Sequence, residues 1–470
     1  MDGKMRTHHD LRCTQSLIRL SGITLAILSA ILGLQNQGVR AAQRIGRADD
    51  HIERYVRRSE RFAMDPADIE KRVQAGGHFA VATGDGSFDL VVVPHDIRAP
   101  WYRAEEETEE GIARPIPRSR IYTYRGFVVG LADSEVRLSI RPDAVEGIIL
   151  TPREWYFVEP MRNYSSSAAL SDMVSYRASD IREGAIGSCG VSLAERIFRA
   201  KDYYEPRVAA GTGISTADVA TEADYEYVTA LGGSTEANTS IMDVMNQVDG
   251  IYRSQLSLSL RVVYQHTWAT ASDPYSSTAP STMLSEFRTY WGANFGSITY
   301  DLAHMWTGKD MDGATVGIAY LGVVCNARSA AYGVSQRLTV APAKYIVTAH
   351  EIGHNFDASH PDQATSPPPD CTNTVMNSSI GTGTNFCQFS KDEISTHVTQ
   401  FPTCLTAGTS GNCDITNDGT VNVLDIQALV NAILGASACP GNCDINKDGK
   451  INVQDLQLLA NIVLGVAFCP

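Results

Sequence analysis

The sequence HEIGHNFDASH at 350–360 constrains this chain more than any other feature. His350 and His354 are four residues apart, so a helix presents both imidazoles on one side, with Glu351 beside them. Imidazole nitrogens are common zinc ligands, and a catalytic zinc site keeps one coordination position open for water. We expect His360 to be the third ligand, which requires a sharp turn after the helix. The pattern therefore predicts a zinc site with Glu351 as general base.

Zinc at such a site would polarise a scissile carbonyl and lower the pKa of its water toward about 7, while Glu351 takes the proton and returns it to the leaving group. A bare HExxH also occurs by accident, with histidines that belong to the surface or core. The added His360 favours the zinc site over that alternative. Because this chemistry does not name its substrate, hydrolysis of a non-peptide amide stays open beside peptide hydrolysis.

The first 43 residues are typical of an export signal. Basic residues precede an apolar run at 20–34, and small residues at 39–41 suit a signal peptidase. Fifteen residues are too few to span a bilayer comfortably, so we expect no stable membrane insertion after cleavage; an uncleaved anchor is the alternative. The protein is predicted to be secreted or extracellular, with a periplasmic or cell-surface location also open.

The chain is acidic, with 53 Asp and Glu against 39 Lys and Arg and a formal charge of −14. A nucleic acid or an anionic membrane would select a basic face, so neither is an expected partner. The 470 residues are enough for about three domains.

Export places the cysteines in an oxidising compartment, where they form disulfides. Four cysteines lie at 413–469 and four at 325–404, and Cys189 stands alone upstream. Two even clusters predict two disulfide-bearing modules, and the odd Cys189 is expected to have another task. In the last module, pairs Cys413–Cys439 and Cys443–Cys469 would each close one repeat, although four cysteines allow three connectivities.

The end of the chain is a duplicated unit. Segments 413–435 and 443–465 repeat at a period of 30, with 13 of 23 positions identical. Each begins with a calcium-loop pattern, which needs oxygen ligands at defined positions and a glycine for the turn, and continues as one helical face. The expected calcium ligands are Asp414, Thr416, Asp418, Thr420, Asn422 and Asp425 in the first loop, and Asp444, Asn446, Asp448, Lys450, Asn452 and Asp455 in the second.

A calcium loop followed by a helix, with no helix before it, is half an EF-hand, and two such units resemble a type I dockerin. The resemblance covers 413–470 and implies a small α-helical module with two Ca²⁺ ions that docks onto a cohesin. A calcium-stabilised terminal cap without a partner is the alternative, since so small a unit commonly needs metals or disulfides to fold.

The stretch at 350–360, with CTNTVMNSSIGTGTNFCQFS at 371–390 and DLAHMWTGKDMDGATVGIAYLGVVC at 301–325, resembles the metzincin zinc peptidases, in particular the reprolysin or adamalysin group. The resemblance implies an α/β (α+β) domain with a mixed sheet and an active-site helix. It also implies Met376 as the Met-turn residue beneath the metal and disulfides Cys325–Cys404 and Cys371–Cys387.

Two positions depart from that family. Asp357 stands where a glycine is usual, although Asp tolerates a left-handed backbone better than most residues. Pro361 and then Asp362 follow the third histidine, where Asp is common directly after it. Nearby, the apolar segment 313–324 is expected to be the sheet edge that pairs with an extended peptide substrate; an ordinary core strand is the alternative. Segments 219–229 and 260–264 are expected strands.

Residues 123–160 resemble the propeptide that accompanies reprolysins, and the region around them is expected to be mainly β. The acidic stretch at 105–111 is expected to be a solvated loop. A Cys189 thiolate could occupy the coordination position of the water and hold the enzyme latent. A free or intermolecularly paired cysteine is the alternative.

These features predict a secreted zinc endopeptidase that is made as a latent precursor and acts on peptides or proteins. The alternative is a non-catalytic secreted binding protein on a metzincin scaffold, against which Glu351 argues. The expected division is a signal peptide at 1–43, a propeptide at 44–205, a catalytic domain at 206–405, a linker at 406–412 and a dockerin at 413–470.

Overall fold

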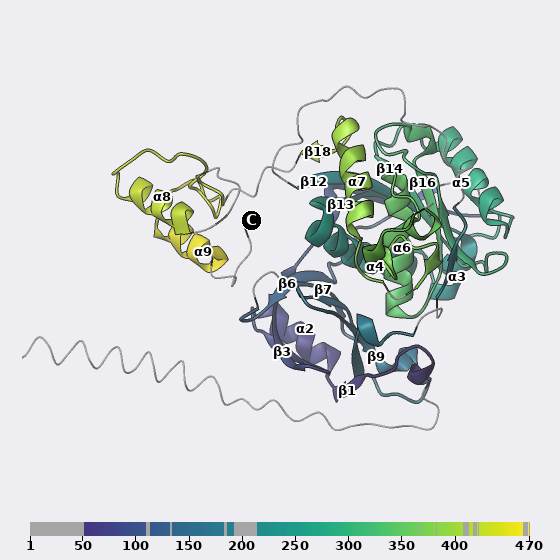
Figure 1. Ribbon diagram of the computed structural model, residues 1–470, viewed down its shortest axis with the longest axis horizontal. Helices are drawn as coiled ribbons and strands as arrows, with labels where there is room; N and C mark the ends of the chain where they lie inside the picture. The colour runs from purple at the N-terminus through teal and green to yellow at the C-terminus, as the bar shows by residue number, and fades with distance from the viewer. Residues whose placement is uncertain are drawn as a thin grey trace, which may run out of the picture. The chain divides into compact units, whose positions relative to one another are not determined.

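A computed structural model describes residues 51–109, 113–131, 134–182, 186–191, 214–364, 366–381, 383–407, 413–416, 421, 423–463 and 469 (Figure 1). The expected signal peptide at 1–43 lies outside these residues, as does most of the expected linker. The described chain mixes α and β structure, as predicted, with a β-rich N-terminal region. Among the described residues, no helix has both the length and the apolar character of a membrane span.

The N-terminal region is an eight-stranded antiparallel sheet in the order β1-β10-β9-β8-β7-β6-β3-β2. Every residue of β8 and β9 is buried, so both faces of these strands are covered. The strands are β1 (Glu60–Ala63), β2 (Phe79–Thr83), β3 (Gly86–Pro94), β6 (Thr123–Val128), β7 (Glu135–Arg141), β8 (Ala144–Leu150), β9 (Trp155–Pro160) and β10 (Asp172–Arg177). One helix, α2 (Pro66–Gln74), begins where Asp65 accepts a hydrogen bond from the Ala67 amide at 2.9 Å.

A second sheet runs in the order β17-β11-β15-β16-β14-β12-β13-β4-β5, and β18 pairs with β12. Its middle strands are parallel, and β15 runs antiparallel to β16. Its strands from residue 215 onward are β12 (Ser215–Ala223), β13 (Leu258–Trp268), β14 (Leu302–Thr307), β15 (Thr315–Ala319), β16 (Tyr332–Gln336), β17 (Ser379–Ile380) and β18 (Thr406–Ala407).

Helices cover both faces of this sheet (Figure 1). Successive residues of a strand face opposite ways, and in β12 Val219 packs in the core that includes α4 and α6, whereas Ala220 packs in the core that includes α5. The helices are α3 (Tyr225–Leu231), α4 (Ser234–Leu256), α5 (Pro280–Asn294), α6 (Ala341–Asn355) and α7 (Gln388–Gln400).

The strand expected at 219–229 ends early. β12 stops at Ala223 because Asp224 caps a helix, accepting a hydrogen bond from the Tyr227 amide at 2.8 Å. Thr406 and Ala407, the first two residues of the expected linker at 406–412, form β18 and pair with β12.

Three strands of the second sheet come from the expected propeptide: β4 (Arg98–Glu107), β5 (Ala113–Ile116) and β11 (Gly187–Cys189). β4 extends the sheet beyond β13, and β11 lies between β15 and β17. The prediction of a solvated loop at 105–111 is therefore wrong for its first three residues, which are half-buried in β4. The partner of Glu105 lies far away in sequence, since the Tyr264 hydroxyl donates to it at 2.7 Å, whereas Glu106 pairs with the nearby Arg114.

The last module contains α8 (Val423–Ile433) and α9 (Val453–Val463). Each repeat contributes equivalent residues to one small core, with Ile415 and Leu429 from the first and Ile445 and Leu459 from the second. The two repeats therefore form one folding unit.

The structure joins Cys325 to Cys404 and Cys371 to Cys387, the pairs that the metzincin resemblance implied. It does not form the expected pairs Cys413–Cys439 and Cys443–Cys469. Cys413 is joined to Cys469, and Cys439 to Cys443. Packing of the two repeats on one core brings the ends of the module together, with the Cα atoms of Cys413 and Cys469 5.9 Å apart, and leaves Cys439 to pair with its near neighbour in the connection.

Candidate metal centre

The three histidines of the 350–360 motif meet at one point. His350 and His354 lie on one side of α6, which begins at Ala341 with a proline in its first turn. The Nε2 atoms of His350 and His354 are 2.9 Å apart, and the Nε2 atom of His360 lies 3.2 Å from the first and 3.1 Å from the second. The arrangement that the spacing predicts is therefore present.

The turn that brings His360 back is made at Asp357. The Asp357 amide donates to the His354 carbonyl at 2.9 Å, and the Ala358 amide donates to the Gly353 carbonyl at 3.0 Å, which is the Schellman pattern of helix termination. That pattern needs a left-handed residue, and Asp357 has φ +70°. Asp357 thus adopts the left-handed conformation at the position where the resembling family usually has a glycine.

Each imidazole is oriented through its other nitrogen. The Nδ1 atoms of His350 and His354 lie 2.6 Å from the carbonyls of Val375 and Ala358, and that of His360 lies 3.3 Å from Oε1 of Gln363. These oxygens only accept, so each Nδ1 carries the proton and each Nε2 is left with a lone pair.

Burial also keeps the imidazoles neutral. It lowers the pKa of His350 to about 3, and it lowers the pKa values of His354 and His360 as well. Three lone pairs then face one another at 2.9–3.2 Å, and a bound cation would remove the repulsion between them. Tetrahedral zinc with bonds of about 2.0–2.1 Å would hold its ligand nitrogens about 3.3 Å apart. The donor set therefore fits zinc.

Glu351 completes the cluster. Its carboxylate is fully buried, and its Oε1 atom has no hydrogen-bond partner among the described residues. Burial raises the pKa of Glu351 well above its ordinary value, a change that suits a group which both accepts and returns a proton. β15 passes close by, since a Cβ on Gly317 would come within 2.4 Å of Oε1.

Comparison with family models identifies the two modules. Residues 215–390 match the family described as Metallo-peptidase family M12, and residues 412–464 match the family described as Dockerin type I domain. The chain carries an M12 metallo-peptidase domain and a type I dockerin domain. The first match contains the histidine cluster, and the second contains both calcium-loop patterns.

In the M12 domain, Met376 lies against α6, where a Cβ on Gly353 would come within 2.6 Å of its sulfur. The structure also contains a hydrogen-bonded link that the sequence did not predict. Asp362 accepts hydrogen bonds from the amide and the hydroxyl of Ser378, at 2.9 and 2.5 Å. Asp362 thus links the segment after His360 to the segment after Met376. The only hint of this role in the sequence was an Asp one residue beyond the position where the family commonly has one.

Cys189 lies beside the histidines. One ligand atom from each of Cys189, His350, His354 and His360 falls within 4.8 Å of the others, and the Cys189 sulfur is 3.5 Å from Nε2 of His354. The Cys189 amide donates to the Ser378 carbonyl at 3.0 Å, and the amide of Gly190 donates to Gly317 of β15 at 2.9 Å. Within the segment 313–324, only Thr315–Ala319 forms a strand, and this strand, β15, already pairs with the chain's own β11.

The second dockerin loop is wrapped around its acidic side chains. Asp444 accepts from the amide of Gly449 at 2.9 Å, and the fully buried Asp455 accepts from the amides of Asn446 and Asn452 at 3.1 and 2.8 Å. Asp448 accepts from the Lys450 amide at 2.9 Å.

In the first loop, Asp425 accepts from both the amide and the hydroxyl of Thr416, at 2.9 and 3.0 Å. Asp414 is also described, whereas Asp418, Thr420 and Asn422 lie outside the described residues. The loops thus place carboxylates of the kind that calcium prefers.

Proposed function

We propose that this chain is a secreted zinc endopeptidase, made as a latent precursor, whose dockerin docks onto a cohesin in the presence of calcium. The observation that carries the proposal is the meeting of three neutral imidazoles beside a buried carboxylate. His350, His354 and His360 would hold the zinc.

Bound zinc would supply Lewis acidity for a carbonyl and a lowered pKa for a water. Glu351 would accept the proton of the attacking water and deliver it to the leaving amine. Its buried setting favours the return of that proton. Val375, Ala358 and Gln363 would keep the three imidazoles in the tautomer that binds a metal.

We infer that the substrate is an extended peptide that adds a strand to β15. The support is the chain's own β11, which pairs with β15 on one side and with β17 on the other. A peptide in the same groove would gain main-chain hydrogen bonds irrespective of its side chains. This pairing favours a peptide over a non-peptide amide.

Latency would come from residues 44–205 acting as the propeptide, with Cys189 as the group that occupies the open metal position. The nearness of its sulfur to His354 supports this role over a free cysteine. Activation would then need a cut in the stretch after Val191, before the M12 domain at 206–405. Export would rest on the signal peptide at 1–43.

For the dockerin at 413–470, we propose two Ca²⁺ ions held by the loop residues named above and a cohesin as partner. The alternative, a calcium-stabilised cap without a partner, fits the small shared core equally well. Binding of a type I cohesin panel with and without a calcium chelator would separate the two.

The test of the peptidase is Glu351→Gln, which keeps the volume of the buried side chain. Activity against a peptide library should fall at least about 100-fold while zinc stays at one per chain. Glu236→Gln, on the exposed part of α4, is the matched control and should change neither. A zinc-loaded, propeptide-free wild type that cuts no peptide would favour the non-catalytic binding protein.

A further inference from the structure

We propose that the propeptide stays bound to the M12 domain after the chain is cut between Val191 and Ile214, so that the cut alone yields an inactive complex of two chains. The inference rests on the proposed function, because it assumes that β11 and Cys189 block the site. It concerns a second surface, defined here as the retention surface: β4, β6, β7, β8 and β9 of the propeptide with β13, α4 and the start of α6 of the M12 domain.

The first part of the retention surface is the shared sheet. β4 pairs in parallel with β13, from Arg98 opposite Val262 to Glu107 opposite Trp268. Side chains join the same strands, since the Tyr102 hydroxyl donates to Gln265 at 2.6 Å. Loss of the propeptide would uncover the edge of β13, an eleven-residue strand, and exposed edges of that length favour aggregation.

The second part is a buried ion pair with α4. Arg137 of β7 lies 2.7 Å from Asp249, with side chains 0% and 1% exposed. The backbone of α4 comes close here, since a Cβ on Gly250 would lie 2.5 Å from Cγ of Arg137. The side-chain amide of Asn246 also donates hydrogen bonds to the backbone carbonyls of Tyr124 and Leu138, both at 3.2 Å. Because water does not reach the pair, salt screens it little.

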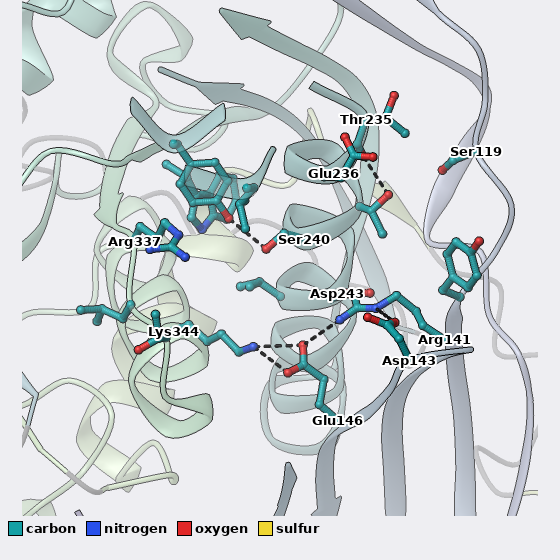
Figure 2. Close-up of a pocket in the computed structure, with 18 of the residues that line it drawn as sticks. Ser119, Arg141, Asp143, Glu146, Thr235, Glu236, Ser240, Asp243, Arg337 and Lys344 are labelled. Carbon is teal, nitrogen blue, oxygen red and sulfur yellow. Dashed lines mark hydrogen bonds and ion pairs between the residues drawn. The ribbon is translucent and has the colours of Figure 1, made fainter. Parts of the chain in front are cut away.

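The third part is a reciprocal exchange of charges at a cavity of about 630 Å³ between the two regions (Figure 2). Lys344 of α6 reaches Glu146 of β8 at 3.0 Å, and Arg141 at the end of β7 pairs with Asp243 of α4. Figure 2 shows Lys344 and Arg141 approaching Glu146 from opposite sides. Each region thus gives one cation and one anion to the other.

The fourth part lies at the start of the active-site helix. Residue Val340 offers no side-chain cap, and the amide of Ala341 donates instead to the buried carboxylate of Glu159, at 3.0 Å. Glu159 is held in place by Tyr164 and Asn163, at 2.6 and 2.9 Å. A carboxylate suits the positive end of a helix, so the propeptide supplies a cap that α6 lacks by itself.

The hydrophobic core is continuous across the same surface. Ile148 and Phe157 of the propeptide belong to one cluster with Val244 of α4 and Tyr345 of α6. A cut after Val191 breaks none of these contacts. Because β11 stays covalently joined to the propeptide, Cys189 would remain at the metal centre until the propeptide itself is destroyed.

The test replaces residues 199–204 with the recognition sequence of a specific protease in the full chain. After complete cutting, the two fragments should elute together in size-exclusion chromatography at about 1 M NaCl, where exposed charges are screened. Peptidase activity should stay at least tenfold below that reached after a second protease degrades the propeptide. Separate elution of the cut fragments would overturn the proposal.

A variant pair locates the surface. The double variant Arg141→Ala with Glu146→Gln should release the propeptide at a rate at least tenfold higher after the cut. Arg177→Ala, which breaks a pair with Asp85 inside the propeptide sheet, should release it as slowly as the wild type does. Equal rates of propeptide release by the double variant and by Arg177→Ala would overturn the assignment of the charged cavity to the retention surface. Joint elution without activity after degradation would refute the peptidase function and leave retention intact.

Discussion

The Cys189 sulfur lies 3.5 Å from Nε2 of His354 and 3.7 Å from Oε2 of Glu351, so one residue of the proposed propeptide contacts both a candidate metal ligand and the candidate base. A thiolate there would compete directly with water for the open coordination position. The strand that carries it is fixed on both sides, by β15 and β17.

Replacing that sulfur should therefore make the uncut precursor partly active. We expect Cys189→Ala to raise the activity of the uncut precursor on a short peptide several-fold, since water can then occupy the metal position. Ser188→Ala, on the same strand, should leave the activity unchanged. Equal activities of the wild-type and Cys189→Ala precursors would remove the cysteine from the latency mechanism.

Asp357 tests the turn between the second and third histidines. Asp357→Val should lower the free energy of unfolding by about 1–2 kcal/mol relative to Asp357→Gly, because a β-branched residue is poorly accommodated at φ +70°. Zinc retained after dialysis should fall in the Val variant and persist in the Gly variant. Indistinguishable unfolding and zinc content in the two would mean that the turn does not position His360.

Buried His304 predicts a pH dependence. Burial lowers its pKa to about 3, from an ordinary value of 6.5, and its Nε2 atom lies 2.8 Å from the Ser335 hydroxyl. Between these values the unfolded chain binds a proton that the folded chain does not, so stability falls as pH falls. In urea titrations between about pH 6 and about pH 4, His304→Gln should reduce that slope by up to about 1.4 kcal/mol per pH unit. An unchanged slope would contradict the account.

The dockerin should depend on calcium for its order. Chelation should make the last 58 residues sensitive to proteolysis, and Asp455→Ala should do so even with calcium present, because Asp455 holds two amides of its loop. Gln457→Ala, which loses only an exposed bond to Asn461, is the control. Unchanged digestion rates after chelation would count against calcium binding.

Local spacing was sufficient to predict the pairing of His350 and His354, since their positions on one helix face follow from helical geometry alone, whereas the position of His360 depends on the turn at Asp357. The duplication of 413–435 at 443–465 was likewise evident from the sequence alone, and in the structure the two repeats pack on one small core.

Features that depend on distant partners could not be predicted in this way. Glu105 gave no strand signal because its partner, Tyr264, lies far along the chain. The predicted dockerin disulfides were wrong because the prediction closed each repeat on itself, whereas the core that the two repeats share brings Cys413 close to Cys469. The strands that residues 44–205 contribute to the second sheet likewise depend on tertiary pairing that no local pattern contains.

The most direct test of the central claim is zinc K-edge absorption on the purified precursor, with His360→Ala beside it. We predict one zinc per wild-type chain, bound by three nitrogens at about 2.0–2.1 Å and one sulfur at about 2.3 Å, and a lost nitrogen or lost zinc in the variant. A wild-type spectrum without three imidazole nitrogens, or one that His360→Ala leaves unchanged, would contradict it.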